Sequence, residues 1–203
     1  MEPTDRVHVQ INFEQRELPK LDYSAKQIVG RIIRLEDIFR QDFERVAREF
    51  GTNSTEAAVL TVLRTQGSPY TLAPNAINQQ RFHTVSSGGL TNILHGLERR
   101  GFVERLPDPS DGRGVLIRLT PRALNFIDRL IEARVAREHR WIAALDAKER
   151  AALETLLRKL LVSLEPVTAP IVRMLPANAE SRHAAGRKSA VKTMGRRRRT
   201  TSR

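Results

Sequence analysis

The chain has 203 residues and a formal net charge of +12, from 35 basic and 23 acidic residues. This length suits one compact domain with extensions, and the absence of cysteine excludes disulfides, thiolate metal sites and thiol-based redox sensing. No apolar run approaches the roughly 18–20 residues that span a bilayer, and the N-terminus lacks a basic region followed by an apolar core. We therefore expect a soluble cytoplasmic protein.

The N-terminal part divides into an arm and a long helix. Residues 1–20 are polar apart from four alternating apolar residues, which predict a short strand or arm that Pro19 closes. These four are Val7, Val9, Ile11 and Phe13. Over residues 21–52 the apolar residues recur at steps of three and four, which predicts an amphipathic helix that Gly51 ends. That stripe consists of Ile28, Ile32, Leu35, Phe39, Phe43, Val46 and Phe50.

Two short helices follow. Asn53 with Glu56 three residues later resembles a capping box, which predicts a helix over residues 53–67. In residues 72–80, Pro74 stands where a first helical turn tolerates proline, so this segment is expected to be the positioning helix of a helix-turn-helix.

A third short helix and a hairpin come next. Ser86 can cap a helix that ends at Gly101, with an inward stripe of Leu90, Ile93, Leu94 and Leu97. Residues 102–106 and 115–119 are strand-like, and the segment between them is dense in turn formers. The pattern predicts a β-hairpin wing.

Two more helices complete the ordered part. Thr120 followed by Pro121 predicts a capped helix start, and the stripe that follows is Leu124, Ile127, Leu130, Ile131, Val135, Trp141 and Leu145. Asp146 with Glu149 starts the last helix, which ends before Pro166. Its apolar residues are Leu153, Leu156, Leu157, Leu160, Leu161 and Leu164.

Residues 166–203 form a basic tail, predicted to be disordered because they contain few large apolar residues. Nine basic residues and no acidic ones lie from Ser181 onward, and without these nine the net charge of +12 falls to +3 for residues 1–180. Selectivity toward a polyanion would therefore depend on individually placed side chains of the body.

The order of elements predicts a mainly α fold with a small β-hairpin wing, a winged helix-turn-helix between flanking helices. Four segments together resemble the multiple-antibiotic-resistance regulator (MarR) family of bacterial transcription factors: residues 85–91 (VSSGGLT), 97–105 (LERRGFVER), 107–113 (PDPSDGR) and 119–121 (LTP). The resemblance covers about residues 53–130.

The resemblance implies an obligate homodimer in which the N-terminal helix and the two C-terminal helices of each subunit interleave. Apolar stripes on helices outside the winged domain must be buried, which independently favours a two-fold partner. The expected division is an arm (1–20), an N-terminal dimerisation helix (21–52), a DNA-binding domain (53–120), C-terminal dimerisation helices (121–165) and the basic tail (166–203).

The expected function is that of a sequence-specific transcriptional regulator, a repressor that binds a palindromic operator in double-stranded DNA on the bacterial nucleoid, without a cofactor or metal. The family typically senses small aromatic or anionic compounds in a cleft between the dimerisation helices and the winged domain. Ligand binding there would release DNA through differential affinity. No compact motif marks such a pocket, so its residues stay unassigned.

The start of the third short helix is the expected phosphate contact. Hydroxyls of Ser86 and Ser87 and free backbone N–H groups would face a phosphate at the positive end of the helix dipole. Gly88 and Gly89 are costly in a helix, and close approach of the backbone to DNA would explain them. The alternatives are an ordinary N-cap at Ser86 and a helix that starts after the glycines.

The base-reading candidates are Thr91, Asn92 and His95, which project away from the apolar stripe. Asn can pair bidentately with adenine, and Thr can contact a thymine methyl group. The alternative is a solvated helix face.

In the wing, Asp111 would organise the turn, Gly112 or Gly114 would take positive φ, and Arg113 would enter a minor groove. The wing motif of the family also ends on this arginine. Relatives often carry a second arginine at the position of Gly112. Arg105 is the other wing residue assigned to DNA.

Other basic residues are weaker candidates. Arg99 and Arg100 could contact phosphates, and Arg196, Arg197, Arg198 and Arg199 would add sequence-independent attraction. The alternative for the tail is a solvated segment without a dedicated role.

Two other functional classes compete with a specific regulator. A nucleoid-type architectural protein would bind DNA mainly through the basic tail, with weak sequence specificity. An enzyme is disfavoured because no phosphate loop or nucleophile motif occurs and the histidines form no metal-spaced pair. Trp141 is assigned to helix packing and not to ligand stacking.

Overall fold

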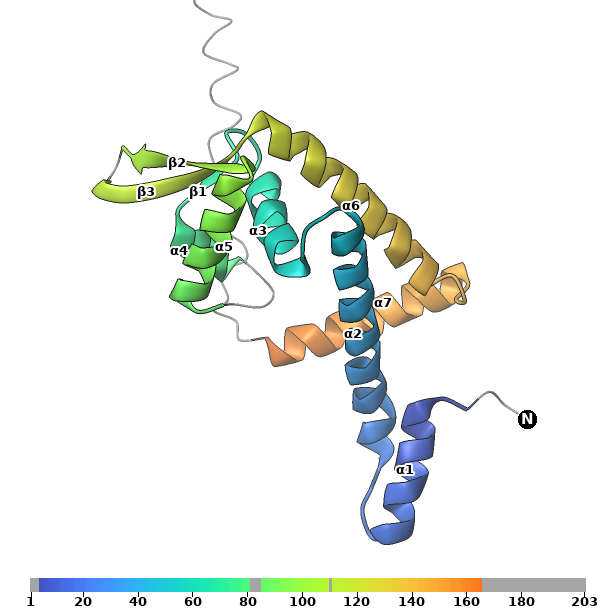
Figure 1. Ribbon diagram of the computed structural model, residues 1–203. Coiled ribbons are helices and arrows are strands. Elements are labelled where there is room, and N and C mark those ends of the chain that lie inside the picture. Colours follow the sequence, from blue (N-terminus) through green and yellow to red (C-terminus); the bar gives the residue numbers. More distant parts are fainter. Residues whose placement is uncertain (1–3, 81–84, 110, 166–203) are drawn as a thin grey trace, which may run out of the picture. The chain divides into compact units, whose positions relative to one another are not determined.

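The computed structural model describes residues 4–80, 85–109 and 111–165 (Figure 1). Along the chain the elements are α1 (Arg6–Glu17), α2 (Ser24–Glu49), α3 (Ser54–Thr65), β1 (Thr71–Leu72), α4 (Pro74–Gln79), α5 (Ser87–Arg99), β2 (Val103–Asp108), β3 (Asp111–Leu119), α6 (Pro121–Trp141) and α7 (Ala147–Leu164). The chain forms two compact units, Met1–Asp146 and Ala147–Arg203. Among the described residues, no helix is long and apolar enough to cross a membrane.

The main core lies where α3, α4, α5 and α6 meet the sheet. Its fully buried side chains include Val59, Leu60, Leu63, Ile77, Leu97, Ile117 and Ile127. The predicted caps are confirmed: Asn53 Oδ1 accepts the N–H of Glu56 at 2.8 Å, and Thr120 Oγ1 accepts that of Ala123 at 3.2 Å. The Glu56 carboxylate does not complete a capping box, because it accepts from Thr52 and Arg100 instead.

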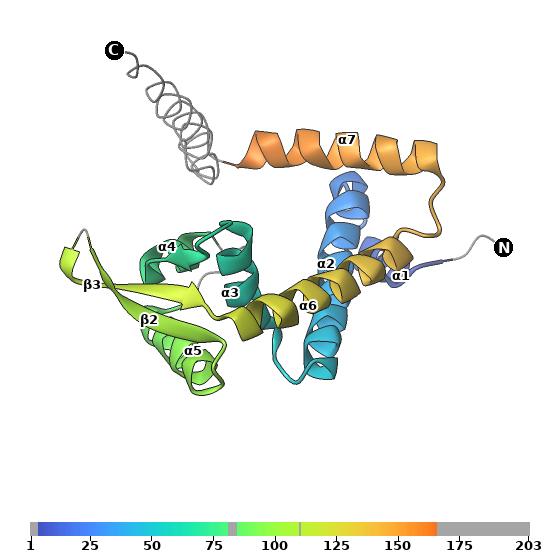
Figure 2. The ribbon, with the colours of Figure 1, turned by 90° about the horizontal axis from the view of Figure 1, so that it is seen from above.

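The sheet has the order β1-β3-β2 and is antiparallel throughout. Figure 2 shows the hairpin that β2 and β3 form. The hairpin is longer than the sequence predicts, because its strands continue to Asp108 and from Asp111, which pair with each other. Of the two glycines expected as alternatives for a positive φ, Gly112 and Gly114, Gly114 does not take one. A Cβ there would lie 2.8 Å from Asp108 Cβ, so glycine provides space for this close approach.

The prediction of a strand or arm in residues 7–13 is wrong, because Arg6–Glu17 is the helix α1. Alternating apolar residues also contain an i, i+4 pair, and Val7 and Ile11 use it to pack with Tyr23. Val7 reaches Gly30 on α2 so closely that a Cβ there would lie 2.8 Å from Val7 Cγ1. Asp5 also caps α1 locally, since its Oδ1 accepts the N–H of His8 at 3.0 Å.

The aromatic cluster between α2 and α6 contains Trp141. Its ring stacks on Phe39, with centroids 4.3 Å apart, and meets Phe43 edge to face at 4.8 Å. Its indole N–H donates to the largely buried Asp42 at 2.9 Å, and Arg137 lies 3.4 Å from the other oxygen of that carboxylate. The assignment of Trp141 to helix packing is confirmed.

Large apolar side chains of α2 remain exposed, and they are Ile28, Val29, Ile33, Leu35 and Ile38. The helix α7, taken by itself, has no buried residue among those described. It exposes Leu153, Leu156, Leu157, Leu160, Leu161, Val162 and Leu164. Both helices thus carry apolar surface that a folded protein normally covers.

Candidate nucleic-acid interface

The helix α5 begins at Ser87, as its cap predicts. Ser86 Oγ accepts the backbone N–H of Gly89 at 3.1 Å. Gly88 and Gly89 thus lie in the first turn, and the alternative of a helix that starts after them is wrong. A Cβ on Gly89 would lie 3.1 Å from Ser86 Oγ, whereas nothing lies within 4 Å of a Cβ on Gly88.

The side chain of Asn78 fixes the approach to α5. Its Nδ2 donates to the backbone oxygen of Val85 at 2.8 Å, and its Oδ1 accepts the N–H of Val85 at 3.0 Å. Asn78 belongs to α4 and Val85 precedes the cap residue Ser86, so this pair links the two helices. The sequence analysis missed this role, since an asparagine at the end of a short helix carries no distinctive signal.

The two faces of α5 separate as predicted. Leu90, Leu94 and Leu97 are buried, and the opposite face exposes Thr91, Asn92 and His95. Thr91 Oγ1 donates to the backbone oxygen of Ser87 at 3.0 Å, and His95 Nδ1 lies 3.7 Å from Glu98 Oε2. The exposed surface of α5 therefore combines a capped N-terminus with short polar side chains.

The wing extends from this helix on β2 and β3, beyond the helices in both views (Figures 1 and 2). Asp111 is exposed at the start of β3, and Gly112 and Arg113 follow it in that strand, while their side chains lie outside the described part. Arg105 forms an ion pair inside the protein, in which its Nε donates to Glu98 Oε2 at 3.0 Å. This pair links the root of the wing to α5.

The other candidate cations differ in their surroundings. Arg99 is exposed at the end of α5, whereas Arg100 donates to Glu56 and to the backbone oxygen of Gly51. The side chain of Arg100 is 35% exposed, and both of its terminal nitrogens donate to groups of the protein. The prediction for Arg196 to Arg199 lies outside the described residues.

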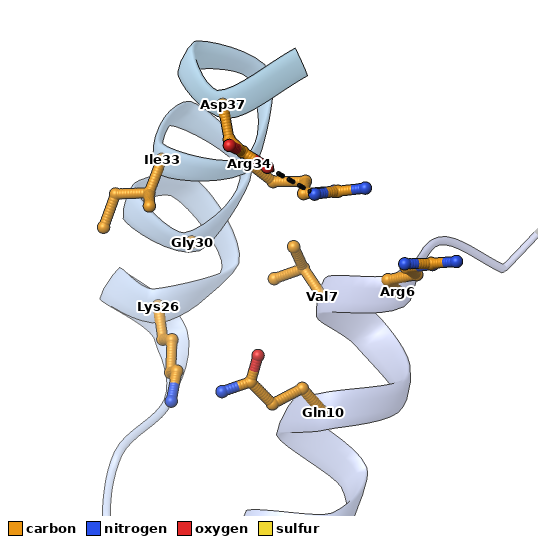
Figure 3. Close-up of a pocket in the computed structure, with 8 residues that line it drawn as sticks. All are labelled: Arg6, Val7, Gln10, Lys26, Gly30, Ile33, Arg34 and Asp37. Atoms are coloured by element: carbon orange, nitrogen blue, oxygen red, sulfur yellow. Dashed lines mark hydrogen bonds and ion pairs between the residues drawn. The ribbon is translucent and has the colours of Figure 1, made fainter. Parts of the chain in front are cut away.

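A cleft of about 460 Å³ lies between α1 and α2 (Figure 3). Val7 and Gln10 line it from α1, and Gly30 and Ile33 from α2, together with Arg6, Lys26, Arg34 and Asp37. Because its walls come from these two helices alone, this cleft is not the expected one beside the winged domain. Within the described part of the chain, no group of three or more His, Cys, Asp or Glu residues could hold a metal ion.

The profile of the MarR family matches residues 52–115, which include α3, α4, α5 and most of the wing. The HTH-type transcriptional regulator PecS of Dickeya dadantii is 27% identical over 143 residues, 70% of this chain and 85% of that protein. The uncharacterized HTH-type transcriptional regulator YkoM of Bacillus subtilis is 33% identical over 149 residues, 69% of this chain and 92% of that protein. These relatives are transcriptional regulators and not enzymes.

Solved structures share the fold. Sco3205, a MarR family regulator from Streptomyces coelicolor solved in complex with DNA, has a TM-score of 0.60 at 20% identity, over 73% of this chain and 93% of that one. The organohalide-sensing regulator RdhR, in its form bound to 2,4-dichlorophenol, has a TM-score of 0.60 at 18% identity, over 75% of this chain and 87% of that one. The expected winged helix-turn-helix with flanking helices is confirmed.

Proposed function

Since the chain belongs to the MarR family of DNA-binding transcriptional regulators, we propose that it binds a palindromic operator as a homodimer and represses the adjacent genes. The protein would act on the bacterial nucleoid, in the cytoplasm. Its division into a DNA-binding domain at residues 53–120 and dimerisation helices on either side belongs to the same proposal.

The observation that carries the proposal is the arrangement of α5. Its first turn presents the exposed Ser87 and Gly88, and the same exposed face continues through Thr91, Asn92 and His95. A major groove admits a helix of this kind, with phosphates at its N-terminus and base edges along its face. In this arrangement Asn92 would read a base, and Arg113 in the wing would enter the adjacent minor groove.

The homodimer is supported by the apolar surface of α2 and α7. Exposed leucines and isoleucines on these helices would be covered by a second copy. Two-fold symmetry of the protein then requires a palindrome with half-sites about 10 base pairs apart, or a multiple of that distance.

Release by a small aromatic or anionic ligand is the regulatory part of the proposal. The structural neighbour RdhR was solved with 2,4-dichlorophenol, and its fold is shared here. A ligand that binds the dimer more tightly in a conformation unsuited to DNA would lower operator affinity by that difference. Titration of chlorophenols and benzoates into the protein–operator complex, monitored by fluorescence anisotropy, tests this part separately.

The test of the DNA-binding function is selection of bound sequences from a random DNA pool, with the full chain and with residues 1–165. We expect both forms to enrich the same palindrome, because α5 and the wing read sequence. Removal of the basic tail should lower the affinity for all DNA and the dependence of affinity on salt, and leave the enriched sequence unchanged. If neither form enriches a motif, the protein is an architectural DNA-binding protein and the proposal fails.

A further inference from the structure

The guanidinium of Arg100, at the C-terminal end of α5, bonds in two directions to distant parts of the chain. Its Nη1 donates to Glu56 Oε2 at 2.7 Å, and its Nη2 donates to the backbone oxygen of Gly51 at 2.8 Å. It also lies 4.8 Å from the centre of the Phe102 ring. A planar guanidinium with this set of partners holds one orientation.

The carboxylate of Glu56 is the receiving group, and it lies directly against α5. Its side chain is only 15% exposed, and the same Oε2 accepts a hydrogen bond from Thr52 Oγ1 at 2.5 Å. A Cβ on Gly96 would lie 3.6 Å from Glu56 Oε1, so a larger side chain on this helical residue would reach the carboxylate. The ion pair is therefore partly shielded from water, unlike a surface pair of little strength.

The same corner of the chain is fixed to α2. Glu44 on α2 accepts the N–H of Ser54 at 2.9 Å, and this hydrogen bond holds the pKa of the Glu44 carboxyl below its ordinary value. Gly51 takes a φ of 70°, a left-handed conformation that ends α2. The N–H of Thr52, the next residue, donates to the backbone oxygen of Ala47 in α2 at 3.0 Å. A continuous set of hydrogen bonds thus runs from α2 through this corner to the end of α5.

We propose that Arg100 is a positioning residue that fixes α5 to the α2–α3 corner and so sets which half-site spacings the dimer accepts. The inference rests on the DNA-binding homodimer proposed above. In that dimer the exposed face of α2 is held at the two-fold interface, so a firm link from α2 to α5 fixes the separation of the two recognition helices. Without the link, each α5 would adjust independently to its half-site.

The experiment measures affinity for a series of operators whose half-sites are moved apart or together by one or two base pairs. We expect the wild type to show a sharp optimum. In Arg100→Gln, affinity at the optimum should fall about 10-fold and change less than about 2-fold at the displaced spacings. Arg99→Gln is the matched control, since it removes the same charge from the exposed neighbouring residue and should lower all affinities equally.

Two further variants separate positioning from a phosphate contact. Arg100→Lys keeps the charge but not the two-directional fork, so it should flatten the spacing profile while leaving the salt dependence unchanged. Glu56→Gln should flatten the profile as well, although Glu56 belongs to α3 and lies outside the proposed DNA surface. Circular dichroism and sedimentation confirm that each variant is folded and dimeric, and Glu56→Gln carries the test if Arg100→Gln does not fold.

An unchanged spacing profile in Arg100→Gln and Glu56→Gln overturns the inference. So does an equal loss at all spacings in Arg100→Gln that Arg100→Lys restores, because Arg100 is then a phosphate contact. If the wild-type protein shows no optimum in half-site spacing, the proposed palindromic operator is contradicted. This result differs from an unchanged optimum in the variants, which contradicts only the role of Arg100.

Discussion

At the scale of single residues, the exposed face of α5 consists of short polar side chains that can make directional hydrogen bonds. Asn92 is exposed next to the exposed Thr91 and the half-buried Ile93. Its backbone is fixed by a helix whose leucines are fully packed on the opposite side. The packing of α5 would therefore preorganise Asn92 for the proposed contact with a base edge.

Asn92→Ala should weaken operator binding by about 1–3 kcal/mol, because a bidentate contact with a base is lost. Fluorescence anisotropy at fixed salt measures the effect, and binding to unrelated DNA should stay unchanged. Asn125→Ala, an equivalent change on the exposed face of α6, is the control. Equal losses on operator and unrelated DNA would show that Asn92 does not read sequence.

Single residues also mark what periodicity can and cannot predict. The 3.6-residue pattern of Leu90, Leu94 and Leu97 was enough to place Thr91, Asn92 and His95 on the outer face. It could not reveal that Arg100 and Arg105 are engaged by Glu56 and Glu98, because these pairs form only when α3, α5 and β2 are assembled. Sequence reasoning therefore could not predict that these two arginines link elements of the protein, and their contacts with DNA stay predictions.

At the scale of elements, α5 is attached at both ends. Asn78 on α4 binds the backbone of Val85 before its N-terminus, and Arg100 binds the α2–α3 corner at its C-terminus. The first attachment joins α4 to the residue that precedes the cap of α5, and the second joins the end of α5 to the residues that follow α2. They can therefore be tested independently.

Asn78→Ala should loosen the start of α5 by removing both hydrogen bonds to Val85, at a cost of about 0.5–1.5 kcal/mol for each. Hydrogen exchange of the Gly89 amide, which bonds to the cap residue Ser86, should speed up while that of the β2 and β3 amides stays the same. Asn75→Ala, at an exposed position of the same helix, is the control. Unchanged exchange at Gly89 would contradict the attachment.

The link between α2 and α3 should depend on pH through Glu44. The N–H of Ser54 lowers the pKa of its carboxyl below the ordinary value of 4.5, so the ionised form stabilises the folded state. This contribution is complete above pH 4.5 and is lost as the pH falls from there through the lower folded pKa. Urea unfolding at fixed protein concentration should show a stability advantage over Glu44→Gln that shrinks across this range, whereas parallel curves would contradict the assignment.

The elements themselves were predictable where a cap or a stop residue marks them, as Asn53, Ser86 and Thr120 do for α3, α5 and α6. The strand β1 was missed because it has only two residues, which gain their partners from β3. The helix α1 was missed because its apolar residues alternate, although Asp5 caps it locally by accepting the N–H of His8 at 3.0 Å. Val7 and Ile11 then pack against Tyr23, a contact that alternation does not predict.

At the scale of the whole molecule, the body carries a net charge of only +3 over residues 1–180. In the proposed function, bulk attraction to DNA would thus come mainly from residues 181–203, and the body would depend on the geometry of α5 and the wing. In the proposed symmetric dimer, two weak contacts with the half-sites would combine into one stronger interaction.

Leu156→Asp should disrupt the dimer, because this leucine is 64% exposed on α7 and a charge there would be buried at the interface. Sedimentation equilibrium should show a dissociation constant at least about 10-fold higher, which corresponds to about 1.4 kcal/mol. Thr155→Asp adds the same charge one residue away, off the leucine stripe, and serves as the control. If both variants dissociate equally, the leucine stripe is not the interface.

Cleavage of DNA from a defined position on α5 tests the central claim, the insertion of two α5 helices into one operator, most directly. Because the chain has no cysteine, His95→Cys can carry a single iron chelate on the exposed face of α5, and Asn125→Cys on α6 provides the control. We predict two cleavage clusters related by two-fold symmetry, with centres about one helical turn apart, and none from the α6 label. Uniform cleavage along the DNA, or equal cleavage from both labels, would contradict this account.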